Sequence, residues 1–184
     1  MRRIFLFMNV SLDGYFEGPD HDISWTSHDY EAFTPDSSAA VDTLLFGHKT
    51  YDMMKSFWPT PQAAQTAPEI ARFMNQKLKV VASHRPFDPG WQNVRVVSNS
   101  VAGEIKQLKE QPGADIIIFG SNNLCVSLLQ WGLLDEVQLL VNPVVLGRGA
   151  SLFQGLPEKV ALKLTASQPF ETGNILLTYQ PLPK

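Results

Sequence analysis

Short apolar runs recur along most of the chain and predict buried β-strands. Each run spans four to eight residues, and several end at a glycine or another turn-forming residue. This is the pattern of strands that are covered on one or both faces. The predicted strands cover residues 4–10, 43–46, 79–83, 94–97, 115–119, 137–141, 161–168 and 175–180.

Helical patterns separate many of the earlier strands, whereas the last strands follow one another directly. Apolar residues at helical spacing predict helices over residues 49–57, 69–76, 102–110 and 124–130. Residues 29–43 predict a helix that starts late or is broken at Pro35, and the three prolines of residues 59–68 predict an exposed loop. The order of elements is typical of a three-layer α/β fold: a mainly parallel central sheet, helices on both faces and an antiparallel C-terminal edge.

Composition and charge narrow the class of protein. The 184 residues, 44% of them hydrophobic, suffice for one substantial core, so a single domain over residues 1–184 is expected. The net charge of −3 argues against nucleic-acid or acidic-membrane partners. Asn9 and Ser11 interrupt the N-terminal apolar run, and no run approaches the roughly 20 residues that span a bilayer. Because Cys125 is the single cysteine, the chain is expected to be cytoplasmic.

Two predicted strands end in a glycine that is followed by polar residues and a helix. These turns begin at Gly47 and at Gly120. Glycine lets the backbone approach an anion, and the N–H groups and dipole of a helix N-terminus favour negative charge. Either glycine alone could simply form a tight turn, but the pair favours a phosphate site at the carboxyl edge of the sheet, where ligands of open α/β sheets bind. Neither turn has the GxGxxG or Walker A pattern, which argues against a standard Rossmann domain or a P-loop NTPase.

Four segments, in order along the chain, resemble one known family. They are Ser-Leu-Asp-Gly-Tyr at 11–15, Leu-Phe-Gly-His-Lys-Thr-Tyr at 45–51, Gly-Ser-Asn-Asn-Leu at 120–124, and the Leu-Asp-Glu strand leading to Pro-x-x-Leu-Gly-x-Gly at 134–149. Over residues 3–181 the chain is similar to the reductase domain of the bifunctional riboflavin-biosynthesis deaminase-reductase. The resemblance implies the dihydrofolate reductase fold and NADPH as cofactor.

The resemblance also implies which residues bind NADPH. Residues 47–50 would approach the pyrophosphate and 2′-phosphate, with His48 or Lys49 as the cation, and residues 120–124 would lie under the pyrophosphate and nicotinamide ribose. Ser83 and Arg85 fall where the family places the adenosine end; Arg85 either binds the 2′-phosphate bidentately or is a solvated loop charge. Ser121 stands where the family usually has a second glycine. The predicted cofactor-binding residues are Gly47, His48, Lys49, Thr50, Ser83, Arg85, Gly120, Ser121, Asn122, Asn123 and Leu124.

The substrate side is less well defined by the sequence. Asp13 follows the first strand, so its carboxylate either contacts a substrate or accepts backbone N–H groups in its own turn, and the turn role is slightly favoured. Glu31, with Asp29 as a near alternative, lies on the segment where dihydrofolate reductases place their pterin-binding carboxylate, although a solvent-facing acid is the commoner interpretation. Aromatic residues such as Trp25 and Phe33 either line a pocket for a flat heterocycle or belong to the core. Arg148 either contacts a phosphate from a flexible flap or is a surface residue.

These observations together predict an NADPH-dependent reductase acting on a C=N or C=O bond of a small heterocycle. The reaction of the family reduces 5-amino-6-(5-phosphoribosylamino)uracil, with Asp13 and Glu31 as the candidate catalytic residues here. The alternatives are a stand-alone dihydrofolate-reductase-like enzyme for another substrate and a nucleotide-binding protein without turnover. The histidines lack zinc-site spacing, so no metal is predicted. Apolar residues around 133–145 and the strand edges predict a homodimer through the C-terminal strands.

Overall fold

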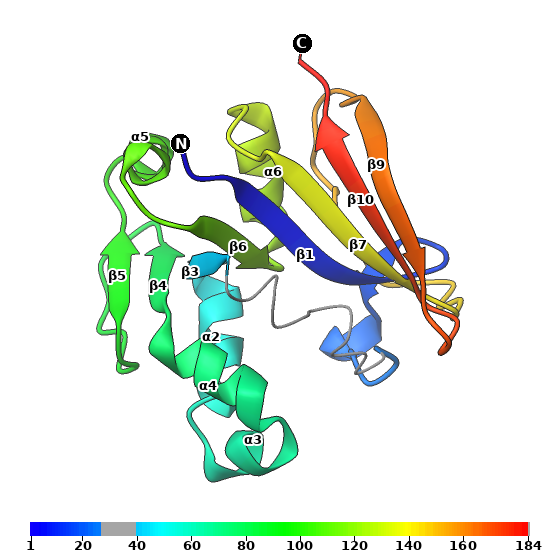
Figure 1. Ribbon diagram of the computed structural model, residues 1–184, viewed down its shortest axis with the longest axis horizontal. Coiled ribbons are helices and arrows are strands. Elements are labelled where there is room, and N and C mark those ends of the chain that lie inside the picture. Colours follow the sequence, from blue (N-terminus) through cyan, green and yellow to red (C-terminus); the bar gives the residue numbers. More distant parts are fainter. Residues whose placement is uncertain (27–39, 184) are drawn as a thin grey trace.

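The computed structural model describes residues 1–26 and 40–183, which form an eight-stranded sheet with helices on both sides (Figure 1). The strand order in the sheet is β5-β4-β3-β6-β1-β7-β10-β9. The strands of this sheet are β1 (Ile4–Ser11), β3 (Val41–Gly47), β4 (Leu78–Ala82), β5 (Val94–Val97), β6 (Asp115–Phe119), β7 (Glu136–Asn142), β9 (Leu162–Pro169) and β10 (Ile175–Pro181).

Strand directions divide the sheet into a parallel part and an antiparallel edge. The six strands from β5 to β7 pair in parallel, so their carboxyl ends lie at one edge. Strand β10 pairs antiparallel with both β7 and β9. This arrangement confirms the predicted fold class: each predicted strand is present, and the antiparallel pairs fall where the sequence lacks intervening helices.

The alternation of side chains along β1 builds the two faces of the core. Ile4 and Leu6 pack in one buried cluster with residues of α5 and α6, whereas Phe5 and Phe7 pack in a second cluster with residues of α2 and α4. Successive strand residues point to opposite faces, so a continuous apolar run serves both layers. The helices are α2 (His48–Phe57), α3 (Pro61–Thr66), α4 (Pro68–Gln76), α5 (Val101–Glu110) and α6 (Asn122–Gln130). None of the helices in the described ranges is long and apolar enough to cross a membrane.

The Leu-Asp-Glu motif that carries much of the resemblance has a structural role. The Asp135 carboxylate accepts a hydrogen bond from the backbone N–H of Ile4 at 2.7 Å and forms an ion pair with Lys109. The Lys109 ammonium also donates to the carbonyl of Leu133 at 3.0 Å, and its side chain is buried. The motif therefore ties the start of β7 to β1 and to the end of α5.

Two predictions about local structure are wrong. Residues 59–68 are not a simple exposed loop, because they contain α3, in which Ala63 is buried. The Thr60 hydroxyl accepts a hydrogen bond from the Ala63 N–H at 3.2 Å, and Pro61 occupies the first turn, where its missing N–H costs nothing. The end of the helix expected over residues 29–43 is strand, since β3 begins at Val41; residues 27–39 lie outside the described residues.

Three short elements were not predicted from the sequence. Strands β2 (Tyr15–Glu17) and β8 (Ala150–Ser151) form a small antiparallel sheet, and the 3-10 helix η1 (Pro19–His21) follows β2. Elements of two or three residues are too short to show a hydrophobic period. They matter because they bring residues 16–26 and 150–154 to the edge at which β1 and β6 end.

Candidate functional site

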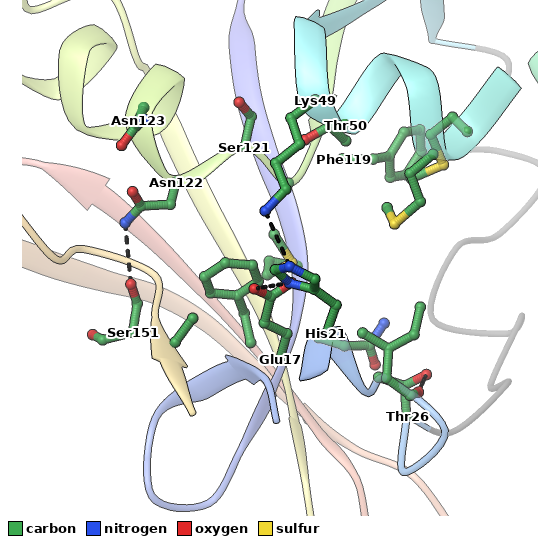
Figure 2. Close-up of a pocket in the computed structure, with 18 of the residues that line it drawn as sticks. Glu17, His21, Thr26, Lys49, Thr50, Phe119, Ser121, Asn122, Asn123 and Ser151 are labelled. Atoms are coloured by element: carbon green, nitrogen blue, oxygen red, sulfur yellow. Dashed lines mark hydrogen bonds and ion pairs between the residues drawn. The ribbon is translucent and has the colours of Figure 1, made fainter. Parts of the chain in front are cut away.

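A cavity of about 600 Å³ opens beside the carboxyl half of β1 and the end of β6 (Figure 2). This volume lies in the range of small-molecule sites. One wall is apolar and includes side chains of β1, β2, α2 and β6, whereas the facing rim is polar. The lining residues are Phe7, Met8, Asn9, Phe16, Glu17, His21, Ile23, Thr26, Lys49, Thr50, Met53, Met54, Phe119, Gly120, Ser121, Asn122, Asn123, Ala150, Ser151 and Gln154.

The turn between β6 and α6 presents a helix N-terminus to this cavity. Gly120 and Ser121 are both left-handed, with φ of +78° and +79°. The first helical hydrogen bond of α6 runs from the Cys125 N–H to the Ser121 carbonyl at 3.0 Å. The N–H groups of the preceding residues therefore have no partner within the helix, and they carry the positive end of its dipole. An anionic group at this end of the cavity would be stabilised.

The two glycine turns that the sequence indicated separately meet at this site. A Cβ atom on Gly47 would lie 2.1 Å from the Ser121 hydroxyl oxygen and 3.2 Å from Ser121 Cβ. Gly47 itself has an ordinary extended conformation. A glycine is therefore favoured at 47 because the Ser121 side chain approaches it closely, and the turn at 120–121 is the one that uses left-handed geometry.

A row of polar side chains crosses the cavity from β2 to α2. The Glu17 carboxylate lies 2.8 Å from His21 Nδ1, and His21 Nε2 lies 3.4 Å from the Lys49 ammonium (Figure 2). The Asn122 amide group donates to the carbonyls of Ser151 and Leu152 at 3.1 and 2.8 Å, which closes another wall with β8. The cavity therefore combines a carboxylate, an imidazole, an ammonium and a helix N-terminus.

The structure brings together about half of the predicted cofactor-binding residues. Six line the cavity, namely Lys49, Thr50, Gly120, Ser121, Asn122 and Asn123. Gly47 adjoins Ser121, as described above. The side chain of Leu124 packs in the core, so only its backbone faces the turn.

The other predicted cofactor residues form a cluster that does not line the cavity. His48 Nδ1 lies 3.1 Å from the hydroxyl of the buried Ser83, and the His48 ring stacks on Phe87 at 4.0 Å. The Ser83 hydroxyl donates to the carbonyl of Arg85 at 2.7 Å, and the Arg85 side chain is exposed. Their role at an adenosine end stays a prediction.

Of the predicted substrate residues, Asp13 does not line the cavity. Asp13 accepts hydrogen bonds from the Ser11 hydroxyl at 2.7 Å and from the backbone N–H groups of Leu146 and Gly147 at 3.1 and 2.7 Å. These bonds, with that of Ser11 first, hold the pKa of the Asp13 carboxyl below its usual value. Asp13 thus joins its own turn to the loop at residues 146–147, and its contact with a substrate stays a prediction.

Of the remaining substrate candidates, Trp25 donates its indole N–H to the Asp22 carbonyl at 3.0 Å, and Arg148 is exposed. Neither lines the cavity. Glu31, Asp29 and Phe33 lie outside the described residues.

Sequence reasoning missed the cavity residues Glu17 and His21. They lie in β2 and η1, which have no hydrophobic period, and the available signal was the Gly18-Pro19 turn shortly after the Ser-Leu-Asp-Gly-Tyr motif. Cys125 can be set aside as a nucleophile, because burial in α6 raises the pKa of its thiol to about 12.

The fold and site define the chain as an α/β protein of the dihydrofolate-reductase-like class. A dihydrofolate reductase from Enterococcus faecalis, complexed with NADP(H), superposes with a TM-score of 0.68 at 15% identity over 97% of this chain and 96% of that one. A putative riboflavin biosynthesis protein from Shewanella sp. PV-4 superposes with a TM-score of 0.77 at 21% identity, covering 98% and 99% of the two chains. At these identities the structural likeness shows the fold alone.

Sequence comparison identifies the family. Residues 2–176 match the model of the RibD C-terminal domain, so the chain belongs to this family. The uncharacterized protein YyaP of Bacillus subtilis (strain 168) is 30% identical over 178 residues, which are 97% of this chain and 94% of the relative. The diaminohydroxyphosphoribosylaminopyrimidine deaminase/5-amino-6-(5-phosphoribosylamino)uracil reductase of Thermotoga maritima superposes with a TM-score of 0.72 at 15% identity, covering 98% of this chain and 57% of that one. The predicted family is thus confirmed, and it is a family of reductases whose members use NAD(P)H.

The cavity residues fit such a dinucleotide. The absence of a side chain at Gly47 and Gly120 leaves the backbone of the two turns open, and a Cβ at Gly120 would come within 3.0 Å of the Met8 side chain. The α6 N-terminus and Lys49 supply positive charge for a pyrophosphate. The apolar wall near Phe119 and Met53 suits a flat ring.

Proposed function

We propose that this protein is an NADPH-dependent reductase of a small heterocyclic substrate with a C=N bond. The observation that carries the proposal is that one cavity brings the Gly120–Ser121 turn and Lys49 opposite Glu17, His21 and an apolar wall. One side has the chemistry of a phosphate site, and the other has acceptors and donors that could orient a heterocycle.

The residues of the chain would align the reactants, because the cofactor supplies the hydride when bound. The α6 N-terminus and Lys49 would hold the anionic part of the cofactor. The apolar wall would exclude water from the reacting ring, the Glu17 carboxylate could accept hydrogen bonds from a substrate, and the Asn9 amide could accept or donate them. Holding two reactants in contact contributes a large part of the rate in such reactions.

The substrate that we propose to test first is 5-amino-6-(5-phosphoribosylamino)uracil, named for the Thermotoga maritima protein. Dihydrofolate is the comparison substrate, named by the Enterococcus faecalis enzyme. Among the described lining residues, the side chains that can carry positive charge are Lys49 and His21. A planar ring that carries at most one phosphate group therefore suits the cavity.

The test is the loss of NADPH absorbance with each substrate, in wild-type protein and in a Ser121→Asp variant that adds negative charge at the start of α6. We expect turnover with the uracil compound, weaker or no turnover with dihydrofolate, and at least a tenfold lower kcat/KM in the variant, about 1.4 kcal/mol. The matched control is Ser167→Asp on the exposed face of β9. Tight NADPH binding without turnover of either substrate would favour a nucleotide-binding protein without catalysis.

A further inference from the structure

The backbone around His21 is unusual. Asp20 and His21 are consecutive and both left-handed, with φ of +57° and +62°. Residues other than glycine adopt this conformation at a cost, and such residues cluster at functional sites. The turn that imposes it is held by hydrogen bonds from the Gly18 N–H to the Asp22 carbonyl at 2.8 Å and from the Asp22 N–H to the Pro19 carbonyl at 3.1 Å.

The strained backbone places the imidazole between two charged groups of different elements. Glu17 on β2 accepts at Nδ1, and its carboxylate is largely shielded, with 21% of its side chain exposed. Lys49 on α2 faces Nε2. Since a carboxylate can only accept and an ammonium can only donate, a neutral His21 carries its proton on Nδ1 and turns the lone pair of Nε2 toward Lys49.

The position of Glu17 is itself fixed by the segment around Gly149, which packs against it. A Cβ atom on Gly149 would lie 2.3 Å from the Glu17 carbonyl oxygen, so the β8 side of the small sheet packs directly on this backbone. Glu17 pairs with Ala150 in the β2–β8 ladder. A carboxylate that orients an imidazole from a fixed strand is the arrangement that general acid–base catalysis needs.

We propose that His21 is the proton donor of the reduction and that Glu17 positions it. This inference rests on the proposed function. Reduction of a C=N bond requires a hydride at carbon, from the reduced nicotinamide dinucleotide, and a proton at nitrogen. In the proposed complex Lys49 turns from Nε2 to the anionic part of the cofactor, so the imidazolium can carry the transferred proton at Nε2 while Glu17 accepts a hydrogen bond from Nδ1. As the π bond of C=N breaks, the nitrogen takes this proton and forms an N–H bond, and the neutral ring is protonated again from solvent, to which 64% of the His21 side chain is exposed.

The charged groups around His21 come from each element packed against it. Glu17 and Lys49 contact its ring, and Asp20 and Asp22 flank it on its own turn. The Asp22 carboxylate has another partner, because it accepts a hydrogen bond from the Ser24 N–H at 2.9 Å. Glu17 is therefore the carboxylate that orients the imidazole.

The test is chemical rescue of a glycine variant. His21→Gly removes the imidazole and suits the left-handed backbone, so the variant is expected to fold with an unchanged or raised Tm. We expect its kcat with NADPH and 5-amino-6-(5-phosphoribosylamino)uracil to fall on the order of 100-fold, with an unchanged Kd for NADPH. Added imidazole should restore a large part of the lost rate, since the side-chain position is open to solvent.

Matched variants separate catalysis from structure. Asp88→Gly, on an exposed loop outside the cavity, is the control for a glycine substitution and should keep full activity. Glu17→Gln should lower kcat with little change in KM, whereas Glu171→Gln on the exposed β9–β10 turn should change neither. In ¹⁵N spectra of histidine-labelled wild-type protein, the neutral His21 ring should be the Nδ1–H tautomer.

Three results would overturn the proposal. They are an Nε2–H tautomer in the wild type, a His21→Gly variant that keeps its kcat, or a loss of kcat that imidazole does not restore. The outcome for the proposed function is separate: NADPH bound by the wild type with no turnover of any substrate rejects the reductase and the proton donor together. Turnover that survives His21→Gly rejects the donor alone.

Discussion

The contact between the two glycine turns can be tested by substituting Gly47. In Gly47→Ala the new methyl group would lie 2.1 Å from the Ser121 hydroxyl oxygen and 3.2 Å from Ser121 Cβ. Rotation of the hydroxyl removes the first overlap. The second persists, because the Ser121 backbone is fixed by the start of α6. Either the turn or α2 must shift by a few tenths of an ångström.

The size of the effect follows from a few opposing contributions. Overpacking at a well-packed contact costs about 1–3 kcal/mol. Alanine is a poorer N-cap residue than glycine for α2, but it also loses less entropy on folding, and these two effects of about 0.5–1 kcal/mol oppose each other. We therefore expect Gly47→Ala to lower the free energy of unfolding by about 1–2 kcal/mol.

A double-mutant cycle isolates the contact. Ser121→Gly removes the opposing side chain and suits the left-handed φ of +79°. Because the Ser121 side chain makes no capping hydrogen bond, this change alone should be neutral or stabilising by up to about 1 kcal/mol. In the Ser121→Gly background, Gly47→Ala should cost less than about 0.5 kcal/mol, which gives a coupling energy of about 1 kcal/mol.

The assay is urea unfolding of the wild type, both single variants and the double variant. An unchanged m value would show that the midpoints report stability alone. If the two substitutions are additive, the methyl group at position 47 does not meet Ser121, and the reasoning that joins the two turns into one site is refuted. NADPH titration of the same four proteins would show whether the coupling extends to ligand binding.

Further predictions concern the framework of the site. Asp135→Ala should destabilise the fold by about 1–3 kcal/mol in urea unfolding, because the buried Lys109 loses its ion-pair partner and the Ile4 N–H loses its acceptor; a cost near zero would refute the role given to the Leu-Asp-Glu motif. Burial lowers the pKa of Lys79 to about 8, so the folded state binds fewer protons than the unfolded state between about pH 8 and 10.5. The stability of the wild type relative to Lys79→Met should therefore rise over that range, by about 3 kcal/mol at most, and a flat difference would contradict it. The lowered pKa of Asp13 contributes stability above the ordinary carboxyl pKa near 3.9 that is lost as the pH falls; Asp13→Asn should therefore show a shallower loss of Tm on acidification, and a parallel loss would reject the loop-joining role.

The fold could be predicted because its main strands and helices are long enough to show a hydrophobic pattern. Eight apolar runs and four helical patterns exceed the length at which strand and helix periods can be recognised, and the missing helices near the C-terminus indicated the antiparallel edge. The α3 helix was missed because its signals are capping signals: Thr60 and Pro61 start a helix of six residues, and prolines nearby had suggested a loop.

The candidate site could be predicted only where glycine marks it. The turns at Gly47 and Gly120 were recognisable, and the geometry joins them. Glu17 and His21 reach the cavity through β2 and the η1 turn that follows it, and β2 is placed by pairing with β8 more than 130 residues away. Such long-range pairing leaves no local pattern. Asp13 was recognised because it lies in the Ser-Leu-Asp-Gly-Tyr motif. Its loop-joining role could not be predicted, because its partners Leu146 and Gly147 are distant in sequence.

The central claim, that the cavity binds a reduced nicotinamide dinucleotide, is tested most directly by titrating the protein with NADPH and following tryptophan fluorescence. The variant to compare is Lys49→Met, with Lys163→Met on the exposed face of β9 as its control. The account predicts saturable binding to the wild type and to Lys163→Met, and at least tenfold weaker binding to Lys49→Met, which is about 1.4 kcal/mol. No saturable binding to the wild type, or equal affinity in all three proteins, would contradict the claim.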